Sequence, residues 1–167
     1  KMKPSPVDPY AISKVASEEV LKNLCDLNNI EWVIAVPHNI IGPRQKYDDP
    51  FRNVVSIMTN LILQKRKPII YGDGEQTRNF SDIDDCLYCL DKLITSKEIL
   101  SETFNIGPDE ESISINELYK MLCNKLQFNE PAQYVEDRPN EVKHAVCSSD
   151  KARKYLNYKT SVNLSDA

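Results

Sequence analysis

Glycine is scarce in this sequence. Only 4 of its 167 residues are glycine, against 10 prolines, whereas glycine makes up about 7% of a typical soluble domain. The spacing of Gly42, Gly72, Gly74 and Gly107 allows neither Gly-x-Gly-x-x-Gly nor Gly-x-x-x-x-Gly-Lys. These patterns mark the phosphate-binding loops of dinucleotide-binding domains and of P-loop proteins. The chain therefore carries no phosphate-binding loop of either kind.

Several other classes of protein are excluded by what the sequence lacks. No apolar run approaches the roughly 18 residues needed to span a bilayer. The net charge is −4, and charges of both signs are scattered, so we expect neither a nucleic-acid partner nor a membrane partner. Hydrophobic residues make up 41% of the chain, which is too much for a disordered protein. The first residue is Lys1 rather than Met, so we expect the chain to begin partway through a longer one.

The cysteines predict reduced thiols and a cytoplasmic location. There are five, an odd number, and they are spread over long intervals. Cys86 and Cys89 form a Cys-x-x-Cys pair, but the pair lies in an apolar helical pattern and has no second pair to match it. Two buried thiols on a core-facing helix are therefore favoured over a redox or zinc site. We expect no metal.

Helical and strand patterns alternate along the chain, which predicts an α/β fold. The unbroken β-prone run at 30–36 is typical of a buried parallel strand. Ser114 and Glu117 form a capping box at the start of one helix. The expected helices are 10–28, 49–62, 84–94, 114–126 and 149–156, and the expected strands are 30–36, 68–71, 77–83, 103–106 and 133–135.

Tyr10 and Lys14 form the first candidate site. They stand four residues apart in an expected helix, so their side chains share one face. An ammonium beside a phenol favours the phenolate, which makes the tyrosine usable as a general acid/base for an alcohol-to-ketone step. A solvated pair at a helix start fits the same spacing.

Three loops carry side chains suited to a phosphorylated ligand. Asn39 follows the first strand, where α/β proteins bind ligands. Arg78 follows a tight turn, and the arginine fork suits phosphate. Arg138 could reach a phosphate and Glu141 a sugar hydroxyl. A structural turn at Asn39 and a surface salt bridge in the loop 137–142 are the alternatives.

Two further features of these loops have simple structural interpretations. Gly42 with Pro43 is expected to fix a loop shape in which the backbone comes close to a ligand. Asp82, Asp84 and Asp85 could suggest a metal site, but acidic residues at a helix start are explained more simply by capping and by the helix dipole.

Five motifs follow one another in a set order. Tyr-x-x-x-Lys heads a helix, and then a strand ends in Asn-x-x-Gly-Pro-Arg-Gln. Next come Gly-Asp-Gly-x-Gln-x-Arg-x-Phe, Phe-Asn-Ile-Gly and Arg-Pro-x-Glu-Val. In this order the chain resembles the carboxyl-terminal half of the extended short-chain dehydrogenase/reductases. More narrowly, it resembles the NAD-dependent epimerase/dehydratase family, and within it the UDP-glucose 4-epimerase-like nucleotide-sugar epimerases.

The resemblance implies a Rossmann-like α/β fold with a small substrate-binding subdomain, whose amino-terminal, glycine-rich half is missing. Residues 1–36 would supply the last catalytic helix and strand of the dinucleotide-binding domain. Residues 37–167 would form mainly the nucleotide-sugar-binding subdomain, with segments that return to the Rossmann sheet. A homodimer of the full-length protein is implied too, with the helix 10–28 at its interface.

The resemblance also implies roles at the cofactor. Tyr10 would be the catalytic base that takes the proton of the sugar hydroxyl while hydride passes to NAD. Lys14 would favour the phenolate and hold the nicotinamide ribose. Pro37 and His38 would lie beside the nicotinamide. The family usually has an aromatic residue where this chain has His38, and a Tyr or His where it has Asp82.

On the substrate side, the resemblance implies that Arg78 and Arg138 clamp the diphosphate of a nucleotide sugar. The other implied substrate-binding residues are Asn39 at the diphosphate, Glu141 near the ribose, Tyr71 against the base and Asn53 in the sugar pocket.

The implied activity is 4-epimerisation of a UDP-hexose by transient oxidation at C4. The isolated chain is expected to be inactive, because the family's glycine-rich loop and catalytic Ser/Thr precede the Tyr-x-x-x-Lys motif. A nucleotide-sugar 4,6-dehydratase or decarboxylase is the alternative within the same class. A non-catalytic nucleotide-sugar-binding module that kept Arg78 and Arg138 is the alternative of another class.

Overall fold

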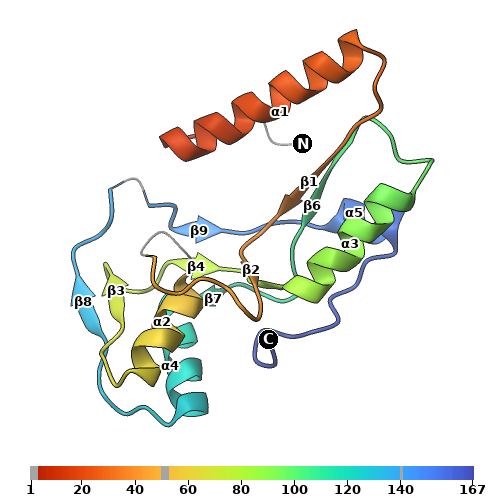
Figure 1. Cartoon of the computed structure of the whole chain (residues 1–167). Coiled ribbons are helices and arrows are strands. Elements are labelled where there is room, and N and C mark those ends of the chain that lie inside the picture. The colour runs from red at the N-terminus through yellow and green to blue at the C-terminus, as the bar shows by residue number, and fades with distance from the viewer. Residues whose placement is uncertain (1–3, 50–52, 140) are drawn as a thin grey trace.

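The computed structural model describes residues 4–49, 53–139 and 141–167. Helices and strands alternate along them, as the sequence predicts, and the fold is α/β (Figure 1). The helices are α1 (Pro9–Leu27), α2 (Val54–Leu63), α3 (Ile83–Thr95), α4 (Ile115–Leu126) and α5 (Asp150–Leu156). The strands are β1 (Val33–Pro37), β2 (Ile40–Ile41), β3 (Ile69–Tyr71), β4 (Thr77–Arg78), β5 (Ser81–Asp82), β6 (Glu102–Ile106), β7 (Ile113–Ser114), β8 (Gln133–Val135) and β9 (His144–Ala145).

Local sequence signals set where the helices begin. The Asp8 carboxylate accepts a hydrogen bond from the Ala11 amide, and Pro9 occupies the first turn of α1. Asp82 caps α3 in the same way, which confirms capping as the role of this acidic residue. Ser114 and Glu117 form the expected capping box of α4. The helix expected from residue 49 begins later, at Val54, and Pro50 of its expected start lies outside the described residues.

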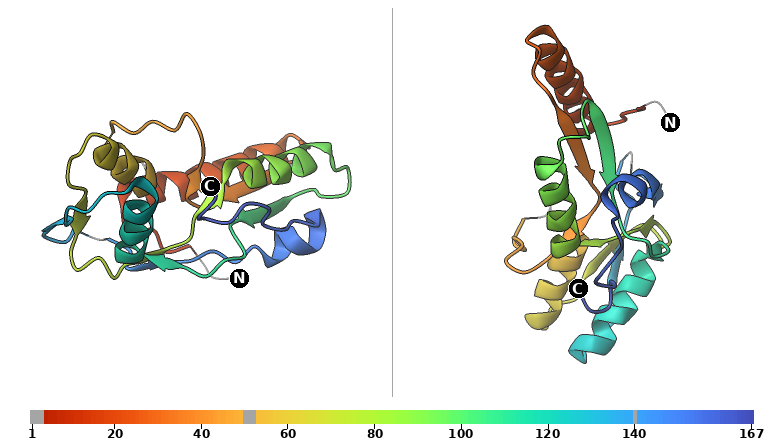
Figure 2. Two further views of the ribbon diagram at one scale, coloured as in Figure 1. Left: turned by 90° about the horizontal axis from the view of Figure 1, so that it is seen from below. Right: turned by 90° about the vertical axis from the view of Figure 1, so that its right-hand side faces the viewer.

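One half of the molecule is built on the parallel pair β1–β6. Val33 pairs with Glu102 and Pro37 with Ile106, and α3 and α5 pack against the pair (Figures 1 and 2). The core beneath these helices contains Cys86, Cys89, Phe104, Ile106 and Leu156. The strand expected at 30–36 begins three residues later than predicted. Its apolar residues are half-buried rather than buried.

The other half holds short strands beside the packed helices α2 and α4 (Figure 1). β2 pairs with β5 and β3 with β8, both in parallel, while β4 pairs with β7 and β9. The single strand expected at 77–83 is therefore wrong. Its two ends, β4 and β5, belong to different sheets, and Phe80 between them turns into the core formed with α2 and α4.

Gly42 allows close packing of the chain against the start of α3. A Cβ at this position would lie 2.5 Å from Cγ2 of Ile83, because β2 comes close to the start of α3. The close neighbour of this glycine is Ile83, and the approach of its backbone to a ligand stays a prediction.

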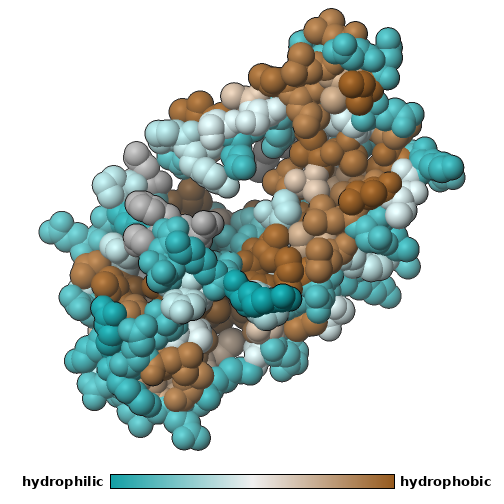
Figure 3. All heavy atoms as spheres, in the orientation of Figure 1, coloured by the Kyte–Doolittle hydropathy of each residue, from teal (hydrophilic) through white to brown (hydrophobic). Residues whose placement is uncertain are grey.

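Helix α1 lies at one end of the molecule (Figures 1 and 2). None of its nineteen residues, all of which the structure describes, is buried. Figure 3 shows hydrophobic residues gathered over the end of the molecule where α1 leads into β1. Leu24, Leu27 and Ile30 are exposed there, Leu27 by 72%. Within the described part of the chain, no helix combines the length and apolarity that a bilayer crossing requires.

Candidate functional site

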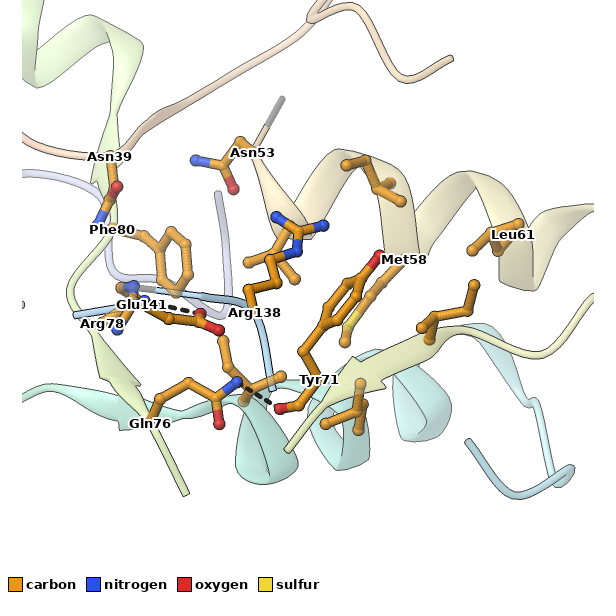
Figure 4. Close-up of a pocket in the computed structure, with 15 residues that line it drawn as sticks. Asn39, Asn53, Met58, Leu61, Tyr71, Gln76, Arg78, Phe80, Arg138 and Glu141 are labelled. Atoms are coloured by element: carbon orange, nitrogen blue, oxygen red, sulfur yellow. Dashed lines mark hydrogen bonds and ion pairs between the residues drawn. The ribbon is translucent and has the colours of Figure 1, made fainter. Parts of the chain in front are cut away.

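A cavity of about 320 Å³ opens between α2, β3, β4 and the loop that follows β8 (Figure 4). Apolar side chains from α2 form much of its wall, among them Val54, Met58 and Leu61. The structure brings all six residues expected to bind substrate to this one cavity: Asn39, Asn53, Tyr71, Arg78, Arg138 and Glu141. They come from four separate stretches of the chain, so it is the tertiary structure that brings them together.

Arg78 is held firmly in the cavity wall. One guanidinium nitrogen donates to the backbone oxygens of Thr77 and Lys143, at 2.8 and 3.3 Å. The other donates to Oε1 of Glu141 at 3.1 Å, and the two side chains are only 17% and 18% exposed. The alternative for the loop of Glu141 was a surface salt bridge; the carboxylate does form an ion pair, with Arg78, and this pair is largely shielded from solvent.

Glu141 keeps one oxygen without a hydrogen bond. Its Oε2 is buried, and the structure gives it no partner among the described residues. A buried acceptor without a donor costs free energy, so this oxygen can accept a hydrogen bond from a ligand hydroxyl.

Arg138 lies over the ring of Tyr71. The centre of its guanidinium is 3.9 Å from the ring centroid (Figure 4), a distance at which cation–π attraction operates. The parallel pairing of β3 with β8 places the two residues together, since Tyr71 ends one strand and Arg138 follows the other.

Gln76 also lines the cavity, and it was assigned no role from the sequence. Its side chain is buried, with the residue 3% exposed, and Nε2 donates to the backbone oxygen of Tyr71 at 2.9 Å. Its Oε1 is buried without a partner in the described part of the molecule. The one signal in the sequence was its place in the Gly-Asp-Gly-x-Gln-x-Arg motif.

Asn39 and His38 lie next to each other where β1 leads into β2. The Asn39 amide nitrogen donates to the backbone oxygen of Asn79 at 2.9 Å and lies 3.3 Å from Nε2 of His38. Burial lowers the pKa of His38, and the nearby Arg78 cation adds to this, while a contact with the Ala145 oxygen opposes it. Neither His38 nor Pro37 lines the cavity, although Asn39 does.

Tyr10 and Lys14 lie outside the cavity. The Lys14 ammonium is 5.4 Å from the centroid of the Tyr10 ring, so the two share one face of α1 as expected. Tyr10 is 71% exposed, and the pair is open to groups from outside the described chain.

The two thiols of the Cys-x-x-Cys pair are buried in the core, as predicted. Burial raises the pKa of Cys89 to about 12, and neighbouring Cys86 and Asp85 add to the effect. A thiolate, which metal binding and redox chemistry both require, is therefore disfavoured there. The described residues contain no group of three or more His, Cys, Asp or Glu that could hold a metal ion.

Comparison with known proteins gives consistent matches along the chain. The family model described as GDP-mannose 4,6 dehydratase matches residues 1–167. A candidate UDP-glucose 4-epimerase of Methanocaldococcus jannaschii is 33% identical over 164 residues, which cover 97% of this chain and 51% of that protein. A dTDP-glucose 4,6-dehydratase of Escherichia coli is 28% identical, over 87% of this chain and 42% of its own.

Solved structures agree with these matches. The crystal structure of UDP-glucuronic acid 4-epimerase from Bacillus cereus, in complex with UDP-glucuronic acid and NAD, superposes with a TM-score of 0.91 at 30% identity. The match covers 99% of this chain and 51% of that one. The chain thus spans about half the length of the relatives it matches.

Proposed function

The chain belongs to the family of the GDP-mannose 4,6 dehydratase model, the NAD-dependent epimerases and dehydratases, and from this membership we propose that it supplies the nucleotide-sugar-binding part of an NAD-dependent 4-epimerase. UDP-hexoses are the proposed substrates. A 4,6-dehydratase or decarboxylase remains the alternative in the same class, since the family contains epimerases and dehydratases alike.

The observation that carries the proposal is the set of groups around one cavity. Two guanidinium groups, on Arg78 and Arg138, offer donors for a diphosphate. The unpartnered Oε2 of Glu141 offers an acceptor for a ribose hydroxyl. The Tyr71 ring offers a flat surface for a base once Arg138, which now lies over it, turns to the diphosphate. A nucleoside diphosphate carries all three matching features in one molecule.

Asn39 needs one rearrangement to join this site. A phosphate oxygen only accepts hydrogen bonds, so Asn39 would bind it through its amide nitrogen. That nitrogen now faces the Asn79 oxygen and the His38 imidazole. We propose that the diphosphate takes the place of His38 as the second partner, while the 2.9 Å bond to Asn79 stays.

Tyr10 and Lys14 are suited to one end of NAD. Their exposed side chains share one helix face, so a ligand held partly by another portion of the protein can reach both. Lys14 would donate to the nicotinamide ribose and favour the Tyr10 phenolate, and Tyr10 would take the proton of the sugar C4 hydroxyl. NAD, when bound, would supply the hydride acceptor for oxidation at C4. Pro37 and His38 would lie beside the nicotinamide.

We extend the proposal to the arrangement of the whole protein. Residues 1–36, with α1 and β1, would complete the dinucleotide-binding domain, and 37–167 would form mainly the substrate subdomain. The exposed apolar residues of α1 would pack in a homodimer of the full-length protein. A cytoplasmic location agrees with five cysteines that are all free thiols.

Calorimetric titration with UDP tests the cavity directly. Replacing Arg78 by Ala should weaken UDP binding by about 1.5–3 kcal/mol, which is roughly ten- to a hundredfold, because charge-assisted contacts to the diphosphate are lost. Arg66 is the matched control, since it is exposed on the loop after α2 and lies outside the cavity. Equal affinities of the Arg78→Ala and Arg66→Ala variants would remove the basis for the diphosphate site.

A further inference from the structure

Asn79 stands between two residues of the cavity but does not line it. Arg78 before it and Phe80 after it both belong to the cavity wall. Asn79 is only 7% exposed, and its side-chain nitrogen donates to the backbone oxygen of Glu110 at 2.9 Å. Its side chain therefore holds a distant segment of the chain rather than a ligand.

The backbone oxygen of Asn79 holds a residue of the proposed substrate site. The side-chain nitrogen of Asn39 donates to this oxygen at 2.9 Å. A side-chain amide carries two N–H groups, so the bond uses one of them and leaves the other for the His38 imidazole, whose Nε2 lies 3.3 Å from the amide nitrogen. This second N–H is the one that we propose for the diphosphate. Asn79 thus sets the direction in which Asn39 offers its donor.

Asn39 needs this support because its backbone has an uncommon conformation. Its φ is +42°, in the left-handed region, which a residue with a Cβ keeps only where its surroundings hold it. Ser81 provides two further hydrogen bonds: its amide donates to the Asn39 oxygen at 3.2 Å and its hydroxyl to the His38 oxygen at 3.0 Å. The segment 79–81 therefore holds both the backbone and the side chain of Asn39.

Glu110, the partner of the Asn79 side chain, is itself fixed in place. Both oxygens of its carboxylate accept from the Leu164 amide, at 3.2 and 3.1 Å. The Leu164 side chain packs against the core that contains Phe80. Hydrogen bonds thus run without a break from the segment near Leu164, through Glu110 and Asn79, to the Asn39 amide at the cavity.

We propose that Asn79 is a positioning residue, which acts through Asn39 and directs the second N–H of the Asn39 amide at the diphosphate. Asn79 itself does not touch the ligand. The inference rests on the proposed function, because it assumes that the cavity binds a nucleoside diphosphate. Loss of the Asn79 side chain would free the backbone of this residue from Glu110, and the Asn39 amide would lose its fixed direction.

The test measures UDP affinity by titration calorimetry in a cycle of variants. Asn79→Ala and Asn39→Ala should each weaken UDP binding about fivefold, the size expected for one hydrogen bond. The double variant should also lose about fivefold rather than about twenty-fivefold, because Asn79 acts only through Asn39. A merely structural role of Asn79 would give losses that multiply.

Asn79→Leu provides a second variant in case Asn79→Ala does not fold. Leucine has nearly the shape of asparagine, so it leaves no cavity. It also removes the Asn79 Oδ1 atom, which is buried without a partner among the described residues. This variant has no donor for the Glu110 oxygen, so it too should bind UDP about fivefold more weakly.

Tyr88→Phe is the matched control. Tyr88 also donates from its side chain to a distant backbone oxygen, that of Leu156 at 3.0 Å, but it does not line the cavity. This variant should keep the UDP affinity of the unaltered chain. Thermal unfolding of all the proteins checks that they are folded.

The possible results separate the inference from the proposed function. An unchanged UDP affinity in Asn79→Ala and Asn79→Leu, together with weaker binding by Arg78→Ala, overturns the role of Asn79 and leaves the diphosphate site standing. Losses that multiply in the double variant also overturn it, since Asn79 would then act by another route. Failure of the unaltered chain to bind UDP at all would overturn both.

Discussion

His38 shows how the wall around the cavity affects a single titratable side chain. Its imidazole is half-buried next to Asn39, and the Arg78 cation lies near it. Burial and this cation both favour the neutral ring, so the pKa of His38 is lowered in the folded state. The unfolded chain, whose histidines titrate near pH 6.5, binds more protons than the folded chain below that pH.

The sign of the pH dependence follows from this difference. Stability rises with pH wherever the unfolded state holds more protons. The contribution of His38 is therefore fully present above about pH 6.5 and is lost as the pH falls below it. We expect the free energy of unfolding of the unaltered chain to drop more between pH 7.5 and pH 5.5 than that of His38→Phe. Urea unfolding at the two pH values measures this, and equal drops would contradict the assignment.

The residues of the cavity differ in how well they could be predicted. Arg78, Arg138 and Asn39 stand in motifs with strong chemical character, and the structure places them around one cavity. The unpartnered oxygens of Gln76 and Glu141 could not be predicted. Whether a side-chain atom lacks a partner depends on every neighbour that packs around it, and those neighbours come from distant parts of the chain.

At the scale of elements, the turn between β3 and β4 links the two strands that carry Tyr71 and Arg78. Gly72 has φ +67°, in the left-handed region that side chains with a Cβ rarely adopt. A Cβ there would also lie 2.1 Å from Oδ1 of Asp137, the residue before Arg138. The turn therefore fixes the position of the loop that carries the second arginine.

Gly72→Ala should destabilise the fold by about 1 kcal/mol from backbone conformation alone, and by more because Asp137 must move. Since Arg138 follows Asp137, UDP affinity should fall as well. In an Asp137→Ala background the steric part disappears, so the same substitution should cost less there. Urea unfolding of the four proteins of this cycle measures the difference, and additive effects would exclude the contact.

The elements themselves were predicted unevenly, for physical reasons. Helices with caps, such as α1 and α4, begin where Asp8 and Ser114 indicate, because a cap is a local interaction. The two-residue strands β2, β7 and β9 were not predicted. Strands this short show no alternation of their own, and they exist only because a partner strand lies beside them.

At the scale of the whole molecule, the family and the α/β class expected from the order of the motifs are confirmed by the match over residues 1–167 and by the superposed epimerase structures. The order of the motifs was enough to predict the family and the fold class, because each motif occupies a set place in the fold. The helix 10–28 was expected at a dimer interface, but it was not predicted that none of the residues of α1 would be buried. The spacing of its apolar residues indicates which side chains share one face of the helix. Only the structure shows that the rest of the described chain does not bury that face.

We expect that the 167 residues alone bind UDP but do not interconvert UDP-hexoses. The cavity is assembled from groups of this chain, whereas Tyr10 and Lys14 lie on an exposed helix whose side chains no other described residue buries. Incubation with UDP-glucose and NAD, followed by chromatography of the sugar nucleotides, measures turnover. NAD-dependent formation of UDP-galactose would contradict the expectation.

The pairing of β4 with β9 has a consequence for the order of folding. It joins Arg78 to Ala145 and thereby brings Glu141 to the guanidinium, across more than sixty residues of intervening chain. Helices form from local contacts and close early, while parallel pairings between distant segments carry a large loop entropy and close late. A refolding chain should thus regain its helical content first and its ability to bind a nucleotide last. The rate at which nucleotide binding returns would therefore report the final step of folding.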